Sequence, residues 1–198
     1  MKKISKWAVK VDTIARVFKG LTIVGGVVLL ICLVLALGIE DTVYEEMNFG
    51  ITLSFVDFDW RPDCNLDVQT MKFFCVGMLL LGIFIFAVRY CQIVIIRRII
   101  KPMTEERPFD DSVTKNIRNL SWVILIGDGM LSVIDFVLQI WLYHAFDYEN
   151  IFLSDKIISV SADYSFDFSF VWLFLVVHLL SYVFQYGQEL QIQSDETL

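Results

Sequence analysis

Four long apolar runs, separated by charged segments, dominate the pattern along the chain. They cover residues 20–39, 73–96, 121–143 and 168–186. A helix rises about 1.5 Å per residue and needs roughly 20 apolar residues to cross a hydrocarbon core. The pattern therefore predicts four transmembrane helices, joined by segments 40–72, 97–120 and 144–167 and followed by a tail at 187–198.

The composition supports this interpretation. Hydrophobic residues make up 57% of the 198 positions, and the mean hydropathy is +0.63, more than a soluble core of this size can bury. The predicted fold class is an all-α membrane protein, a four-transmembrane-helix bundle forming a single domain over residues 1–198. A cleaved signal peptide is the alternative for the first run. The long basic leader and the three later runs favour an uncleaved anchor.

Lysine and arginine are unevenly distributed among the connecting segments. Six precede the first run and six lie in 97–120, whereas 40–72 and 144–167 together hold three. Basic segments stay in the cytoplasm, so we expect a multi-pass protein of the cell membrane with both termini cytoplasmic. The net charge of -7 then conceals an acidic outer side and a basic inner side. The inner side suits anionic lipid headgroups better than nucleic acid.

The two segments expected outside share an alternating pattern. Apolar and polar residues alternate over 51–59 and over 158–168, which is typical of strands. A lone strand or hairpin is marginally stable in water. We therefore expect both outer segments to contribute to one small extracytoplasmic β element.

The segment expected inside has its own signals. Pro102 is expected to end the second helix, and Pro108 to hold a short turn before possible capping residues at Asp110, Asp111 and Ser112. The next helix is expected to run unbroken into the third span, with its first turns standing in the cytoplasm as an exposed stalk.

Motifs of the common enzyme and metal sites are missing from the sequence. It contains no CxxC pair, Gly-rich phosphate loop, GxSxG elbow or HExxH, and its two histidines are His144 and His178. We therefore expect no enzymatic activity, no catalytic or metal-binding residues and no cofactor. A disulfide between Cys64 and Cys75 is conceivable but disfavoured.

Ionisable residues inside the apolar runs are the candidate site. Helical spacing places Ser121, Asp128, Ser132, Asp135 and Gln139 on one stripe of the third span. A charge in hydrocarbon is costly unless it faces inward and finds a partner. We expect an intramembrane polar cluster of Arg89, Asp128, Asp135, Gln139 and His178, in which Asp128 pairs with Arg89, His178 or both. Two interpretations remain open: structural contacts between helices, or a protonation-sensitive or ligand-contacting element.

Two further stretches carry a resemblance. "ERPFDDSVTKNIRNLSW" and the terminal "YGQELQIQSDETL" resemble domain-of-unknown-function family 2975, small bacterial four-span membrane proteins. In that family a Pro-Phe pair opens the third helix before an Arg and an aromatic, and Gly, Glu-Leu-Gln and Asp close the chain. The matching residues here are Pro108, Phe109, Arg118, Trp122, Gly187, Glu189, Leu190, Gln191 and Asp195. Ser121 replaces the usual small residue before the aromatic, a mild departure.

The resemblance implies a non-enzymatic regulator or sensor rather than a catalyst. Such proteins are encoded beside small helix-turn-helix regulators, which implies a cytoplasmic partner of that kind. The expected partner surface comprises Arg107, Pro108, Phe109, Arg118, Glu189, Leu190, Gln191 and Asp195. The alternative is that the tail only packs on the inner segment. For function, the alternative is a small transporter or immunity-type protein, in which a homo-oligomer surrounds a polar intramembrane path.

Overall fold

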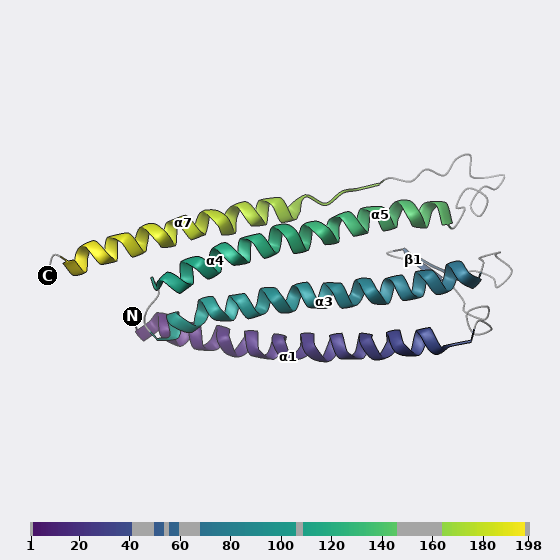
Figure 1. The fold of residues 1–198 in the computed structure, drawn as a ribbon, viewed down its shortest axis with the longest axis horizontal. Coiled ribbons are helices and arrows are strands. Elements are labelled where there is room, and N and C mark those ends of the chain that lie inside the picture. Colours follow the sequence, from purple (N-terminus) through teal and green to yellow (C-terminus); the bar gives the residue numbers. More distant parts are fainter. Residues whose placement is uncertain are drawn as a thin grey trace. The chain divides into compact units, whose positions relative to one another are not determined.

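A computed structural model describes residues 2–40, 50–53, 56–59, 68–105, 109–145 and 164–196 (Figure 1). Four helices within these ranges are long and apolar enough to cross a membrane: Trp7–Gly38, Val68–Thr104, Asp111–His144 and Ser169–Ser194. This confirms the prediction of four helices with the length and composition of membrane spans. Only 6 to 11% of each apolar window is buried. Most of these side chains are therefore at least partly exposed, as expected when lipid covers much of each helix.

The helices extend beyond the apolar runs. Helix α1 spans Lys2–Gly38, α3 spans Val68–Thr104, α4 spans Asp111–Val123, α5 spans Gly129–Ala145 and α7 spans Ser169–Glu196. Most of the tail that was expected after the fourth span therefore continues α7. Pro102 was expected to end the second helix, but α3 continues to Thr104. A proline in the last turn removes only one backbone donor, so the helix can run on for two residues before it ends.

By contacts the chain forms two compact units. The first contains Met1–Gly25, Ile85–Ile140 and Asp163–Leu198, and the second contains Gly26–Phe84 and Trp141–Ala162. In the second unit, strands β1 (Gly50–Leu53) and β2 (Val56–Asp59) form an antiparallel hairpin, in which Gly50 faces Asp59 and Leu53 faces Val56. The segment over 51–59 thus pairs with itself. The expected partner covers 158–168, of which 158–163 lies outside the described residues, whereas 164–168 is described and forms no strand. The expectation of a strand is therefore wrong at 164–168, and pairing through 158–163 stays a prediction.

Among the described residues of the first unit, α4 and α7 share the most extensive contact between two helices. The buried face of α4 contains Val113 and Ile117, and at its end Ser121 is fully buried, as is Ser181 on α7. Such small residues let two helix backbones approach closely in a membrane. The first turns of α4 are therefore not an exposed stalk, because one face packs on α7. The opposite face is open, since the Lys115 side chain is 72% exposed.

Helix α4 begins as the sequence predicts. The Asp110 carboxylate accepts a hydrogen bond from the Ser112 backbone N–H at 2.9 Å, which caps the first turn. From there the chain stays helical to Ala145, as the continuous ribbon from α4 to α5 shows (Figure 1). Five residues in the middle, Ile124–Asp128, form a π-helix, η1. A π segment bonds each N–H one residue farther back than an α-helix does. The π segment therefore rotates the side chains of α5 about the helix axis relative to those of α4.

Candidate functional site: an intramembrane polar ring and cleft

Three side chains form a closed ring of hydrogen bonds inside the apolar part of the first unit. The Arg89 Nη1 donates to Asp128 Oδ1 at 3.0 Å and to Gln92 Oε1 at 2.8 Å. The Gln92 Nε2 donates to Asp128 Oδ2 at 3.1 Å. Both carboxylate oxygens of Asp128 are therefore occupied by donors from α3. The expected pairing of Asp128 with Arg89 is confirmed.

The π segment positions Asp128 for this ring. Asp128 is the last residue of η1, and the preceding residue, Gly127, lies against α3. A Cβ added at Gly127 would be 2.8 Å from Val88 Cγ1, closer than real side chains approach. The absence of a side chain at Gly127 therefore allows η1 to come near enough for Asp128 to reach Arg89.

The ring lies at one end of a cleft of about 470 Å³. The Arg89 side chain is 50% exposed and Asp128 only 14%, so the guanidinium rather than the carboxylate is accessible. The rest of the cleft is lined by acidic and hydroxyl groups together with three apolar side chains. The polar residues are Ser132, Asp135, Asp167 and Ser169, and the apolar ones are Leu131, Phe170 and Leu173. The cleft thus offers one partly neutralised cation and two further carboxylates.

Asp135 and Gln139 lie on the side of the cleft toward the start of α7. The Gln139 Nε2 donates to Asp135 Oδ2 at 2.7 Å. Gln139 also contacts the backbone N–H and carbonyl oxygen of Ser165, each at 3.4 Å. Among the described residues Asp135 has no cationic partner, and its one amide contact comes from its own helix. Asp128 and Asp135 therefore differ sharply: the first is held by another helix and the second is not.

His178 does not join the ring. Its Nδ1 lies 3.1 Å from Ser121 Oγ, which in turn donates to the Arg118 carbonyl oxygen at 2.7 Å. The ring of His178 stacks on Phe174 with centroids 5.1 Å apart and meets Trp122 edge-on. Of the two partners left open for Asp128, the structure therefore shows Arg89 and not His178. Because η1 follows Ser121 and ends at Asp128, the predicted single stripe is split: Ser121 faces α7 and Asp128 faces α3.

The expected partner surface is only partly described. Phe109 precedes α4 and packs against α7, where its ring is 5.9 Å from that of Phe184. A Cβ at Gly187 would come within 2.5 Å of the Phe109 ring. Arg118 lies over the Tyr182 ring at 6.0 Å and contacts Gln185. Leu190 is 47% exposed, and Gln191 is exposed beside it, while Glu189 accepts a hydrogen bond from Gln185. Arg107, Pro108 and the side chain of Asp195 lie outside the described part of the chain.

Two contributors were missed by the sequence analysis. Gln92 completes the ring, and its position three residues after Arg89 on the same helix face was a usable signal. Asp12 bonds Arg97 at 2.9 Å and so joins α1 to α3, but nothing in the spacing of two residues so far apart in sequence indicated that contact. Cys75 is a free thiol, while Cys64 lies outside the described residues.

The four apolar helices define a multi-pass membrane protein. Comparison of the chain with family models, with curated proteins and with solved structures gives no match. Within the described residues no group of three or more His, Cys, Asp or Glu side chains is placed to hold a metal ion. The site is therefore characterised by its own geometry: a charged hydrogen-bond ring beside an open, acidic cleft.

Asp167 makes the start of α7 sensitive to pH. Its Oδ1 accepts from the Ser169 N–H and its Oδ2 from the Ser169 hydroxyl, both at 2.8 Å, and these bonds hold the pKa of Asp167 below its ordinary value. A lowered pKa in the folded state contributes stability above the ordinary pKa of about 3.9, and that stability is lost as the pH falls through the lowered value. Below the lowered pKa of Asp167, we expect the hydrogen of the Ser169 amide to exchange with solvent faster than the intrinsic pH dependence of amide exchange predicts. NMR measures this exchange rate. Asp167→Asn is expected to abolish this extra increase in the exchange rate at low pH. The same increase in the variant would show that Asp167 is not its cause.

Proposed function

We propose that this protein is a non-enzymatic regulator of the bacterial cell membrane, with the polar cleft as input and the α4–α7 end as output. Both termini are cytoplasmic in this proposal, since the basic residues cluster at that end of the helices. The partner is a small cytoplasmic helix-turn-helix regulator, as the family resemblance implies. The protein itself binds no nucleic acid.

The continuous helix from Asp111 to Ala145 is the observation that carries the proposal. Its π segment holds Asp128 against Arg89, and its first part packs on α7 through a buried face. A π segment is an irregular helix that recurs at functional sites. A ligand in the cleft that changes the Asp128 contacts would change the helical rotation that η1 introduces. Such a change would rotate α4 relative to α7. The two ends are thereby mechanically connected.

The output surface is expected to depend on Phe109. Leucine at Gly187 would occupy the space of the Phe109 ring, because even a Cβ there comes within 2.5 Å of it. We expect Gly187→Leu to reduce capture of the helix-turn-helix partner from native membranes at least about fivefold, the factor that corresponds to 1 kcal/mol. The measurement is quantitative mass spectrometry of the co-purified proteins.

The matched control is Gly20→Leu, since among the described residues nothing lies within 4 Å of a Cβ at Gly20. The control should capture as much partner as the unmodified protein. Absence of any helix-turn-helix protein from the unmodified sample would contradict the regulator proposal. Equal capture by the Gly187→Leu variant would instead contradict the assigned surface.

A transporter or immunity-type protein is the second candidate, favoured by the cleft itself. A volume of about 470 Å³ lined by Arg89, Asp135 and Asp167 could admit a small solute or a proton. Four short helices seldom enclose a pore alone, so this function needs a homo-oligomer. A stable oligomer with ion flux in liposomes, reduced by Asp135→Asn, would support it over the regulator.

A further inference from the structure

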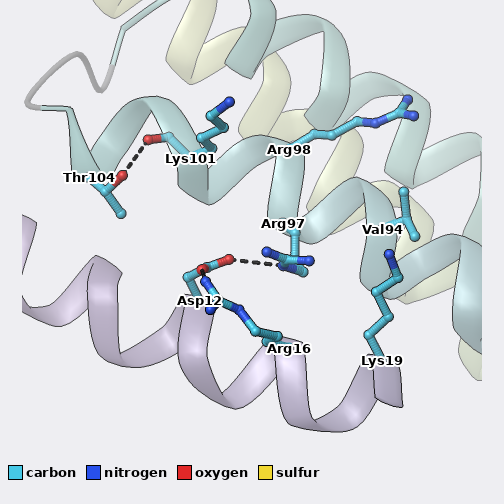
Figure 2. A pocket seen from close by; sticks show the side chains of 8 residues that line it. All are labelled: Asp12, Arg16, Lys19, Val94, Arg97, Arg98, Lys101 and Thr104. Atoms are coloured by element: carbon cyan, nitrogen blue, oxygen red, sulfur yellow. Dashed lines mark hydrogen bonds and ion pairs between the residues drawn. The ribbon is translucent and has the colours of Figure 1, made fainter. Parts of the chain in front are cut away.

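A second pocket, distinct from the cleft, lies between α1 and α3. Its volume is about 360 Å³, and its basic lining comes from Arg16 and Lys19 on α1 and from Arg97, Arg98 and Lys101 on α3. Figure 2 shows these side chains on the two neighbouring helices, with Asp12 between Arg16 and Arg97. The lining thus contains five basic groups and one carboxylate, which leaves an excess of positive charge.

Asp12 organises part of this pocket without neutralising it. Its Oδ1 accepts from Arg97 Nε at 2.9 Å and its Oδ2 from Arg16 Nη2 at 3.0 Å, as the dashed lines in Figure 2 mark. Both of its oxygens are then engaged. The two guanidiniums are held in place by this carboxylate and still have unused N–H donors, since each guanidinium carries five.

The remaining cations are free to bind an anion. Among the described residues, Lys19, Arg98 and Lys101 have no carboxylate partner. The Lys19 Nζ lies 5.5 Å from the Tyr90 ring centroid, a contact that orients the ammonium and leaves its charge in place. Mutual repulsion among these groups falls when an anion lies between them, so the pocket is built for negative charge.

The depth of the pocket identifies the source of that charge. Lys19 immediately precedes the apolar run at 20–39, and Arg97 immediately follows the run at 73–96. The pocket therefore lies where hydrocarbon gives way to headgroups, and Val94 on its wall belongs to the apolar run itself. A phosphate attached to acyl chains can contact the basic side chains and the apolar run at the same time. A free phosphate can contact only the basic side chains.

We propose that this pocket binds the phosphate-bearing headgroup of an anionic phospholipid. The arginines of the lining donate charge-assisted hydrogen bonds to the headgroup, and the lysines supply the remaining charge. Basic pockets between transmembrane helices are a recognised setting for such headgroups. A bound lipid would bridge α1 and α3 in the same place as the Asp12 contacts. This proposal is independent of the regulatory function.

Native mass spectrometry of the full chain, released from micelles doped with phosphatidylglycerol or phosphatidylcholine, tests the proposal. The variant is Arg98→Gln with Lys101→Gln, because both side chains are exposed and their loss should leave the fold intact. The control is Lys10→Gln with Lys115→Gln, which removes the same charge at exposed positions away from the pocket. We expect phosphatidylglycerol to bind the variant about 30-fold more weakly, from the loss of two interfacial cations.

The control should bind phosphatidylglycerol as the unmodified protein does, and phosphatidylcholine should bind weakly throughout. Equal binding of the two lipids, or equal loss in variant and control, would overturn the proposed pocket. Displacement of phosphatidylglycerol by millimolar inorganic phosphate would overturn the lipid as the ligand. Thermal unfolding of both double variants is recorded alongside, and Lys19→Gln serves as the second variant if the first unfolds.

Discussion

Replacing Asp128 with Asn is expected to lower the free energy of unfolding by about 3 kcal/mol, the scale of an uncompensated charge within a membrane helix. The substitution keeps the shape of the side chain but leaves the Arg89 guanidinium without a counter-charge. In the native protein that guanidinium donates to the Asp128 carboxylate at 3.0 Å. Denaturation in mixed micelles, followed by tryptophan fluorescence, measures the change.

Asp135→Asn is the matched control, one carboxylate on the same stretch of helix. Asp135 contacts only Gln139 among the described side chains, so its neutralisation leaves no cation stranded. We expect the free energy of unfolding to change by less than about 1 kcal/mol, or to rise, because the charge that is removed has no ionic partner among the described residues. A loss at Asp135 as large as that at Asp128 would show that the ring has no special role.

Introducing leucine at Gly127 is expected to have the second large effect. The new side chain would meet Val88, whose Cγ1 lies 2.8 Å from the position of the first added carbon. Overpacking of this kind costs about 1 to 3 kcal/mol, and separation of η1 from α3 would also break the Asp128 contacts. We expect a clear fall in the thermal midpoint of the purified protein, measured by fluorescence-detected size exclusion after heating.

Gly77→Leu controls for the change of glycine to a larger apolar residue in a helix. Within the described residues nothing lies within 4 Å of a Cβ at Gly77, and leucine favours the helix more than glycine does. The thermal midpoint of this variant should stay level or rise. An equal fall in both variants would mean that glycine itself, rather than the close approach to Val88, is what the helices require.

Hydropathy alone was sufficient to predict the four helices, because each must satisfy its backbone internally and present apolar side chains to lipid. The ends of the helices were less predictable. The proline at 102 is a local signal that the last turn of α3 tolerates, and α7 continues to Glu196 through residues that have no apolar periodicity. Helix ends depend on neighbours as much as on sequence, so α3 runs two residues past Pro102 and α7 runs into the expected tail.

The candidate site was predictable in chemistry but not in detail. A charge in an apolar run must find a partner, and this rule led correctly from Asp128 to Arg89. The same rule left His178 open as a partner, and helical spacing could not exclude it. Helical spacing assumes a constant 3.6 residues per turn, and η1 departs from that value. No local pattern at Ile124–Asp128 signalled the π segment. Its position follows from the contact of Gly127 with Val88, a contact between two helices.

Arg89 and Asp128 are expected to stabilise the protein as a pair rather than as two separate side chains. A double-mutant cycle with Arg89→Met, Asp128→Asn and both together tests it most directly, with the free energy of unfolding as the measured quantity. The double variant is expected to be more stable than the sum of the single losses predicts, by about 2 kcal/mol, because neither charge is left alone. Simple additivity of the two single losses would contradict the pairing.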